Sequence, residues 1–128
     1  MSATKASVAP RFKLWISSSE AEGVFGDGKW RLLKAIESGG SLRAASESLG
    51  ISYRKAWGDL RKAEERLGVI FLEKHRGGAG GGETTLTDAG REWIAGYSRF
   101  RTEIEKTTAK AFGKHIQKLL KRKGRKKR

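Results

Sequence analysis

Residues 41–68 read SLRAASESLGISYRKAWGDLRKAEERLG, and this stretch decides the fold that the sequence predicts. Ser41 can accept a hydrogen bond at a helix start, and apolar residues then recur at helical spacing as far as Gly50: Leu42, Ala45 and Leu49. Ser52 offers a second N-cap, and a longer apolar stripe follows it at steps of three and four: Tyr53, Trp57, Leu60, Ala63 and Leu67. The stretch predicts a helix-turn-helix, the unit whose second helix fits a DNA major groove, with an ordinary helical hairpin in a core as the alternative.

The residues before this unit predict one strand and one helix. In RFKLWIS, residues 11–17, apolar Phe12, Leu14 and Ile16 alternate with Arg11, Lys13 and Trp15, which is the period of a strand with one buried face. The segment EAEGVFGDG is typical of a turn. In KWRLLKAIESGG, the apolar residues Leu32, Leu33 and Ile36 share one face before a Gly-Gly stop, so we expect a first helix there.

A hairpin with a glycine tip is predicted after Gly68. VIFLEKH is rich in β-branched and apolar residues, ETTL can pair with it, and GGAGGG lies between them. Glycine this dense costs order in a simple turn, which favours a tip that approaches another backbone closely, as a wing does in a minor groove. A nucleotide-binding loop is the rival, but G-x-x-x-x-G-K-[ST] is absent and no lysine follows Gly82.

A long helix with one apolar seam is predicted from Thr87 onward. Apolar residues repeat there at near-heptad spacing: Trp93, Ile94, Tyr97, Phe100, Ile104 and Ala111. Gly113 is expected to end this helix. The segment KLLKRKGRKKR has too few apolar side chains to offset its ordering entropy and charge repulsion, so we expect disorder there, apart from some helix near Ile116 to Leu120.

The charge of the chain points to a polyanionic partner. A formal charge of +14 attracts nucleic acid first and an anionic membrane surface second. Residues 111–128 carry nine Lys or Arg and no acid, against nineteen and fourteen in residues 1–110, so the excess concentrates in the tail. The absence of cysteine fits a reducing interior, and no apolar run approaches the ~20 residues of a membrane span. We therefore expect a soluble cytoplasmic, nucleoid-associated protein with no membrane partner.

The exposed side of the second helix supplies the candidate DNA contacts. Arg54, near its start, is the best candidate for base reading, because arginine can pair with guanine. Ser52 can meet a base or a phosphate, and the hydroxyl of Tyr53 could reach a phosphate while its ring stays packed. Trp57 is taken as core and not as a stacking platform. Three cations of this helix, Lys55, Arg61 and Lys62, could equally be solvated charges. The full predicted set also includes wing and tail residues: Ser41, Lys55, Arg61, Lys62, Lys74, Arg76, Gly77, Gly78, Gly80, Gly81, Gly82, Lys121, Arg122, Lys123 and Arg125.

Catalysis finds little support in the sequence. His75 and His115 have no nearby cysteine and no second ligand at i+3 or i+4, so no metal site is predicted. Acid pairs such as Glu64 and Glu65 lie among lysines and arginines, where solvated ion pairs are expected. We expect no enzyme activity, no cofactor and no metal.

Three motifs in order carry a resemblance to a known family: GSLRAASESLGISYRKAW, then EKHRGGAGGGETTLTDAG, then a long helix containing AFGKH. Over about residues 11–115 the chain resembles the winged helix-turn-helix domain of the ModE-type molybdate-responsive regulators, and LRKAEERLGVIFLEKH is similar to the related LysR-type domains. The resemblance implies residues 52–55 near the major groove, the glycine wing beside it, and a homodimer joined through the long helix at Trp93, Tyr97, Phe100, Ile104 and Ala111. Sensing members carry further C-terminal oxyanion-binding domains, whereas this chain ends in KRKGRKKR, so we expect no molybdate sensing and no small-molecule effector.

Together these patterns predict a mainly α fold with a small β hairpin, a winged helix-turn-helix with a long C-terminal dimerisation helix. We expect a flexible leader over residues 1–10, the domain over residues 11–113 with its dimerisation helix at about 87–112, and a basic, disordered tail over residues 114–128. The predicted function is sequence-specific binding of double-stranded DNA as a homodimeric transcriptional regulator, with the tail on phosphates. The alternatives are an abundant architectural or nucleoid protein with little sequence choice, an RNA- or ribosome-associated protein, and membrane attachment through KHIQKLLKRK.

Overall fold

The computed structural model describes residues 7–76 and 83–121. The chain divides into two compact units, residues 13–98 and a second unit whose described parts are residues 7–12 and 99–121. The glycine tip at 77–82 and the segment 122–128 lie outside the described residues, and the predicted boundaries at residues 10 and 113 stay predictions.

Two very short strands open the larger unit. β1 (Trp15–Ile16) pairs antiparallel with β2 (Phe25–Gly26), so that Ile16 lies opposite Phe25. The prediction of a strand over residues 11–17 is wrong in extent, because β2 offers only two partners before a helix begins. The turn predicted for EAEGVFGDG is also partly wrong, since it contains β2. A side chain at Gly26 would place its Cβ 2.7 Å from the Cβ of Trp15, so this pairing requires glycine.

Three helices follow, and their ends confirm the predicted caps. They are α1 (Asp27–Gly39), α2 (Leu42–Leu49) and α3 (Tyr53–Leu67). The Ser41 hydroxyl accepts the N–H of Ala44 at 3.1 Å, and the Ser52 hydroxyl accepts that of Lys55 at 3.0 Å. Between α2 and α3, Gly50 has a φ of 71°, a left-handed conformation that favours glycine and turns the chain.

One residue of the expected apolar face of α2 lies outside the core. Leu49 is 41% exposed, so its assignment to the buried face is wrong. The inward position before it is filled by Ser46, which is 2% exposed and whose hydroxyl donates to the carbonyl of Leu42 at 2.8 Å. A local hydrogen bond therefore satisfies the buried hydroxyl, and the apolar contact of α2 ends one turn early.

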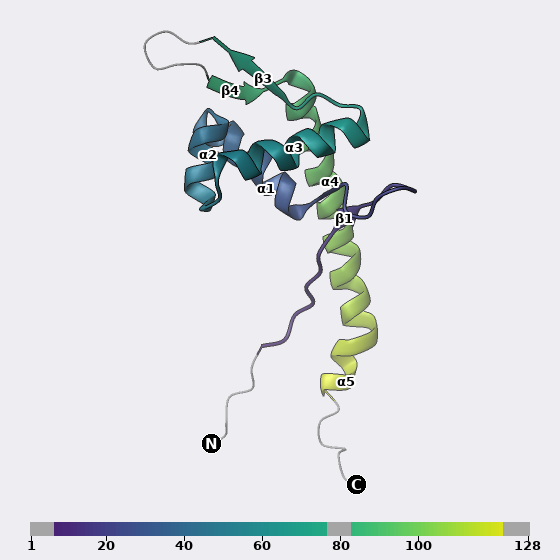
Figure 1. Cartoon of the computed structure of the whole chain (residues 1–128). Coiled ribbons are helices and arrows are strands. Elements are labelled where there is room, and N and C mark those ends of the chain that lie inside the picture. Colours follow the sequence, from purple (N-terminus) through teal and green to yellow (C-terminus); the bar gives the residue numbers. More distant parts are fainter. Residues whose placement is uncertain (1–6, 77–82, 122–128) are drawn as a thin grey trace. The chain divides into compact units, whose positions relative to one another are not determined.

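The predicted hairpin is present and lies along α3. β3 (Leu72–His75) pairs antiparallel with β4 (Glu83–Leu86), with Leu72 opposite Leu86 and His75 opposite Glu83. β3 runs back beside α3 toward the N-terminal end of that helix (Figure 1). The strand is shorter than VIFLEKH, because its partner β4 ends at Leu86, opposite Leu72, and α4 begins two residues later. The ring of Phe71, just before β3, is fully buried in the core.

The core of this unit joins all three helices, the hairpin and the start of a long helix, α4 (Asp88–Phe112). The ring of Phe25 contacts those of Phe71, Trp93 and Tyr97, with centroid separations of 5.9, 5.5 and 5.1 Å. Such tilted and edge-on pairs add to the stabilisation from burial alone. The remaining fully buried large side chains are Leu33, Ile36, Leu42 and Leu60.

A buried polar contact ties the N-terminal segment to α4. The Tyr97 hydroxyl lies 2.8 Å from the carboxylate of Asp27 and 3.0 Å from the carbonyl oxygen of Leu14. The same carboxylate accepts the N–H of Leu14 at 3.3 Å. Asp27 also opens α1, where a negative charge suits the positive end of the helix dipole. Sequence patterns gave no sign of this contact.

The second unit contains the rest of the long helix. After α4 the chain continues as a π-helical turn, η1 (Gly113–Gln117), and then as α5 (Lys118–Lys121). The α-helix therefore ends at Phe112, directly before Gly113 as predicted, but the chain stays helical beyond it, because glycine weakens a helix by about 1 kcal/mol without forbidding it. The helix expected near Ile116 to Leu120 is confirmed. In the same unit the guanidinium of Arg101 lies 4.6 Å above the ring of Phe12.

Candidate nucleic-acid interface

The first turn of α3 presents two basic side chains to solvent. Ser52 caps the helix, and Arg54 and Lys55 that follow are exposed, whereas Ala56 is fully buried. Within the part of the chain that the structure describes, Arg54 has no ion pair or hydrogen bond through its guanidinium. This geometry leaves all five N–H donors of that side chain available to a ligand.

The other predicted cations of α3 differ in their pairing. Lys55 forms an ion pair with Asp59 at 3.0 Å, and Arg61 lies 3.7 Å from Glu64. Lys62 is exposed and has no acidic partner among residues 7–76 and 83–121. Exposed pairs such as Lys55 with Asp59 contribute only about 0–1 kcal/mol, so a phosphate can compete for the lysine.

Tyr53 connects α3 to both of its neighbours. The guanidinium of Arg43, in the first turn of α2, lies 4.5 Å from the centre of the Tyr53 ring. The Tyr53 hydroxyl is 3.5 Å from the hydroxyl of Thr84 on β4, a long hydrogen bond. The expected packing of the Tyr53 ring agrees with this placement, whereas a contact of its hydroxyl with a phosphate stays a prediction.

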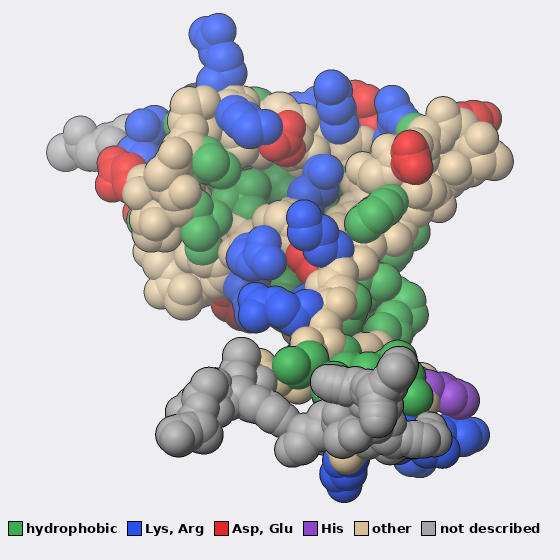
Figure 2. Space-filling view, turned by 90° about the horizontal axis from the view of Figure 1, so that it is seen from below, with side chains coloured by type: hydrophobic (Ala, Val, Ile, Leu, Met, Phe, Trp, Pro, Cys, Tyr) green, Lys and Arg blue, Asp and Glu red, His purple; other side chains and the backbone are tan. Residues whose placement is uncertain are grey.

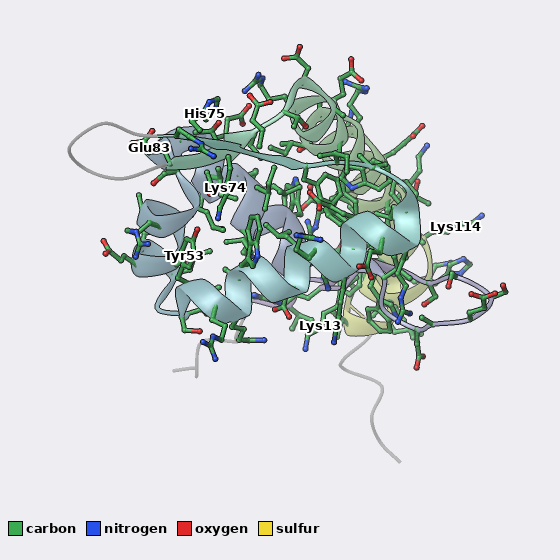
Figure 3. The ribbon with its side chains drawn as sticks, turned by 45° about the horizontal axis from the view of Figure 1, so that its top comes forward. Lys13, Tyr53, Lys74, His75, Glu83 and Lys114 are labelled. Atoms are coloured by element: carbon green, nitrogen blue, oxygen red, sulfur yellow. The ribbon has the colours of Figure 1, made fainter. Side chains whose placement is uncertain are left out.

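Trp57 forms a second link between α3 and the hairpin. Its half-buried ring packs against the core, as predicted, with Lys74 of β3 at 5.5 Å and Arg61 of α3 at 5.6 Å from the ring centre. In Figure 3, Lys74 lies between β3 and α3, close to the end of the helix that bears Tyr53. These cation–π contacts bring two predicted phosphate ligands from different elements to the same ring.

A buried carboxylate fixes the start of the hairpin against α3. Glu64 is only 7% exposed, and its Oε2 accepts the N–H of Phe71 at 2.8 Å and that of Leu72 at 3.1 Å. The expectation of a solvated Glu64 is therefore wrong. Because Glu64 lies on the inner face of α3, its carboxylate takes the place of the strand carbonyl groups to which these two amides would otherwise donate.

The described ends of the hairpin lie at the same end of α3 as Tyr53 (Figure 3). His75 contacts Thr85 at 2.9 Å and Glu73 at 3.5 Å, and Arg76 is exposed. The wing residues proposed to touch DNA, Gly77, Gly78, Gly80, Gly81 and Gly82, fall outside the described residues. No cluster of three metal-binding side chains and no helix suited to crossing a membrane occurs in the described ranges.

The residues predicted to join two chains have different surroundings. In the larger unit, Trp93 is half-buried and Tyr97 is 4% exposed, and both pack in the core of the chain itself. In the other unit, Phe100 is 43% exposed, Ile104 is half-buried and Ala111 is exposed. A contact with a second chain through these side chains stays a prediction.

Several functional candidates lie outside the set chosen from the sequence or outside the described residues. Arg43 was missed, although its place two residues after the N-cap Ser41 puts a cation in the first turn of α2, next to α3. Lys121 is exposed at the end of α5, while Arg122, Lys123 and Arg125 are not described. Lys and Arg side chains are spread across the face shown in Figure 2, with fewer acidic side chains among them.

A helix-turn-helix whose second helix is followed directly by a two-stranded hairpin defines the winged helix-turn-helix class. Residues 28–91, from the first turn of α1 to the first turn of α4, match the family described as bacterial regulatory helix-turn-helix protein, lysR family. The match covers half of the chain. The chain therefore belongs to this family, which consists of regulatory proteins and not of enzymes.

Similar curated proteins confirm the resemblance to the ModE-type regulators. The molybdenum-pterin-binding protein MopB of Rhodobacter capsulatus is 35% identical over 75 residues, 59% of this chain and 28% of that protein. The DNA-binding transcriptional dual regulator ModE of Escherichia coli K12 is 36% identical over 66 residues, 52% of this chain and 25% of that protein. The molybdenum transport protein ModE of Herbaspirillum seropedicae is 41% identical over 64 residues, 50% of this chain and 24% of that protein. The chain spans about a quarter of the length of these relatives.

Proposed function

We propose that this chain is a transcriptional regulator that binds double-stranded DNA, with the start of α3 in the major groove and the β3–β4 hairpin at the adjacent minor groove. One observation carries the proposal: Arg54, which is exposed and forms no ion pair within residues 7–76 and 83–121, lies at the end of α3 beside which the hairpin is held. Two contacts link the hairpin to that end of the helix: Tyr53 contacts Thr84, and Trp57 contacts Lys74. A protruding helix start with a hairpin next to it suits two neighbouring grooves of one duplex.

The contacts divide into base reading and phosphate binding. We assign base reading to Arg54, because a guanidinium can bond two acceptors on the edge of guanine. The other cations of the helix and hairpin would neutralise phosphates, which sets affinity and register but carries little sequence information. They are Lys55, Arg61, Lys62, Lys74 and Arg76, with Ser41 and Ser52 as hydrogen-bonding neighbours and the basic tail as a further phosphate ligand.

We further propose that two copies associate through the seam on the long helix. The exposed Phe100 and the near-heptad spacing to Ile104 and Ala111 support this arrangement. A symmetric pair would read two half-sites about 34 Å apart, one turn of the duplex. Such a regulator would work on the nucleoid in the cytoplasm, and we assign it no catalytic role and no effector.

A selection from random duplexes tests the proposal. The enriched site is titrated with the wild-type protein, with Arg54→Ala, and with Arg66→Ala, which removes an exposed arginine from the other end of the same helix. Losing a bidentate base contact should weaken binding to the enriched site by about 1–3 kcal/mol and relax the preference at one base pair, while Arg66→Ala changes little. Equal losses for the two variants, with the preference unchanged, would contradict base reading by α3.

A second candidate is an architectural protein that coats DNA with little sequence choice. The observation that favours it is the charge of residues 111–128, which hold nine Lys or Arg and no acid. Competition between one enriched site and bulk genomic DNA at physiological salt separates the two. Specific regulators prefer their sites by ~10³ to 10⁷, whereas a coating protein shows little preference.

A further inference from the structure

A glycine lies in the middle of α3 on its exposed face. Gly58 is exposed, and a Cβ at this position would meet no heavy atom within 4 Å. Its φ is not among the positive values of the chain, so the backbone here suits any residue. A glycine inside a helix makes that helix less stable than an alanine at the same position would. Neither the packing nor the backbone conformation of this unit therefore explains why residue 58 is a glycine.

The surroundings of Gly58 suggest the reason. At about 100° per residue, it falls at the middle of the arc of α3 that carries the exposed cations. Arg54 lies one turn before it and Lys62 one turn after it, and neither has an ion pair within the described part of the chain. Lys55 and Arg61 lie at the two edges of the same arc. The basic face therefore has bare backbone at its centre.

We propose that Gly58 is the point at which duplex DNA comes into van der Waals contact with the backbone of α3. This inference rests on the proposed function. A side chain there would hold the groove away from the helix and lengthen the contacts of Arg54 and Lys62 together. The missing Cβ is thus a steric determinant of how deeply α3 enters the duplex, and it acts alongside the charges.

If Gly58 only faces solvent and takes no part in DNA binding, the opposite result is expected for one substitution. Gly58→Lys adds a cation to the centre of a basic face, and electrostatics alone would then strengthen binding to DNA. Under close approach the same variant binds more weakly despite its extra charge. Gly58→Ala adds a single methyl group with no charge and isolates the steric effect.

The experiment titrates a duplex enriched by the wild-type protein with Gly58→Ala, Gly58→Lys and the control Gly28→Ala. Gly28 is also exposed and helical, and a Cβ there meets nothing within 4 Å. Gly58→Ala should melt at or above the wild-type temperature yet bind at least about fivefold more weakly, the scale of losing one good base contact. Gly58→Lys should also bind more weakly, and Gly28→Ala should bind as the wild type does.

Three results would overturn the inference: Gly58→Lys affinity at or above wild type, Gly58→Ala affinity within about twofold of wild type, or a lower melting temperature for Gly58→Ala. The last would mean that the helix itself needs the glycine. The proposed function fails separately, when the wild-type protein enriches no duplex and binds none.

Discussion

Removal of the Glu64 carboxylate should destabilise the protein strongly, because this group accepts both of the first two amides of the hairpin segment and so anchors them to α3. Glu64→Ala leaves the N–H groups of Phe71 and Leu72 without their acceptor. These residues are 0% and 7% exposed, so water cannot easily replace the carboxylate. An unsatisfied buried donor costs about 1–3 kcal/mol, which gives a loss of about 2–6 kcal/mol for the pair. That is a large part of the ~5–15 kcal/mol that stabilises a typical domain.

Urea unfolding followed by far-ultraviolet circular dichroism measures this loss directly. Glu65→Ala serves as the matched control, since it removes an exposed carboxylate from the next position of the same helix. Glu64→Gln should lie between the two, because its amide oxygen can still accept a hydrogen bond. If Glu64→Ala and Glu65→Ala unfold within about 0.5 kcal/mol of each other, the carboxylate does not hold the hairpin to α3.

Three other outcomes can be measured with the same protein. Tyr97→Phe removes the hydroxyl between a carboxylate and a carbonyl, and should lower the free energy of unfolding by about 1–3 kcal/mol; an unchanged urea midpoint would contradict this. Gly90→Ala places a Cβ 2.8 Å from the carbonyl oxygen of Phe71 and should destabilise by about 1–3 kcal/mol, whereas Gly96→Ala meets nothing within 4 Å and should stabilise by up to about 1 kcal/mol. The reverse order of melting temperatures would refute the close contact at Gly90. Deleting residues 122–128, which include six Lys or Arg, should flatten the salt dependence of DNA affinity by up to about 0.9 logarithmic units per lost phosphate contact while preserving site preference; an unchanged slope would exclude the tail from binding.

Local sequence patterns were sufficient to predict the helices and the hairpin. The serines at 41 and 52 and the glycines that follow α1, α2 and α3 act on their own neighbours, so their effects can be read within a few residues. The alternation in RFKLWIS correctly placed Leu14 and Ile16 against the core, but it overstated the strand. Strands β1 and β2 have two residues each, so their pairing leaves no sequence pattern long enough to recognise. Strand β2 is also followed directly by α1.

The contacts that join elements far apart in the sequence could not be read from local patterns. Asp27 and Tyr97 are 70 residues apart, and Tyr53 and Thr84 are 31 apart, so no periodicity connects them. In the sequence, Glu64 resembles a surface acid among cations. Only the path of the chain after Gly68 shows that its carboxylate accepts hydrogen bonds from two buried amides. Helix α3 could be predicted because its buried residues recur at helical spacing within one element. The position of the hairpin beside it could not.

Chemical-shift mapping of backbone amides on addition of an enriched duplex tests the central claim most directly. If α3 enters the major groove with the hairpin beside it, the largest changes fall on residues 52–58 and on both described ends of the hairpin, His75 and Glu83. Changes confined to residues beyond 111, with the amides of α3 unmoved at saturation, would contradict it and leave only electrostatic binding through the basic tail.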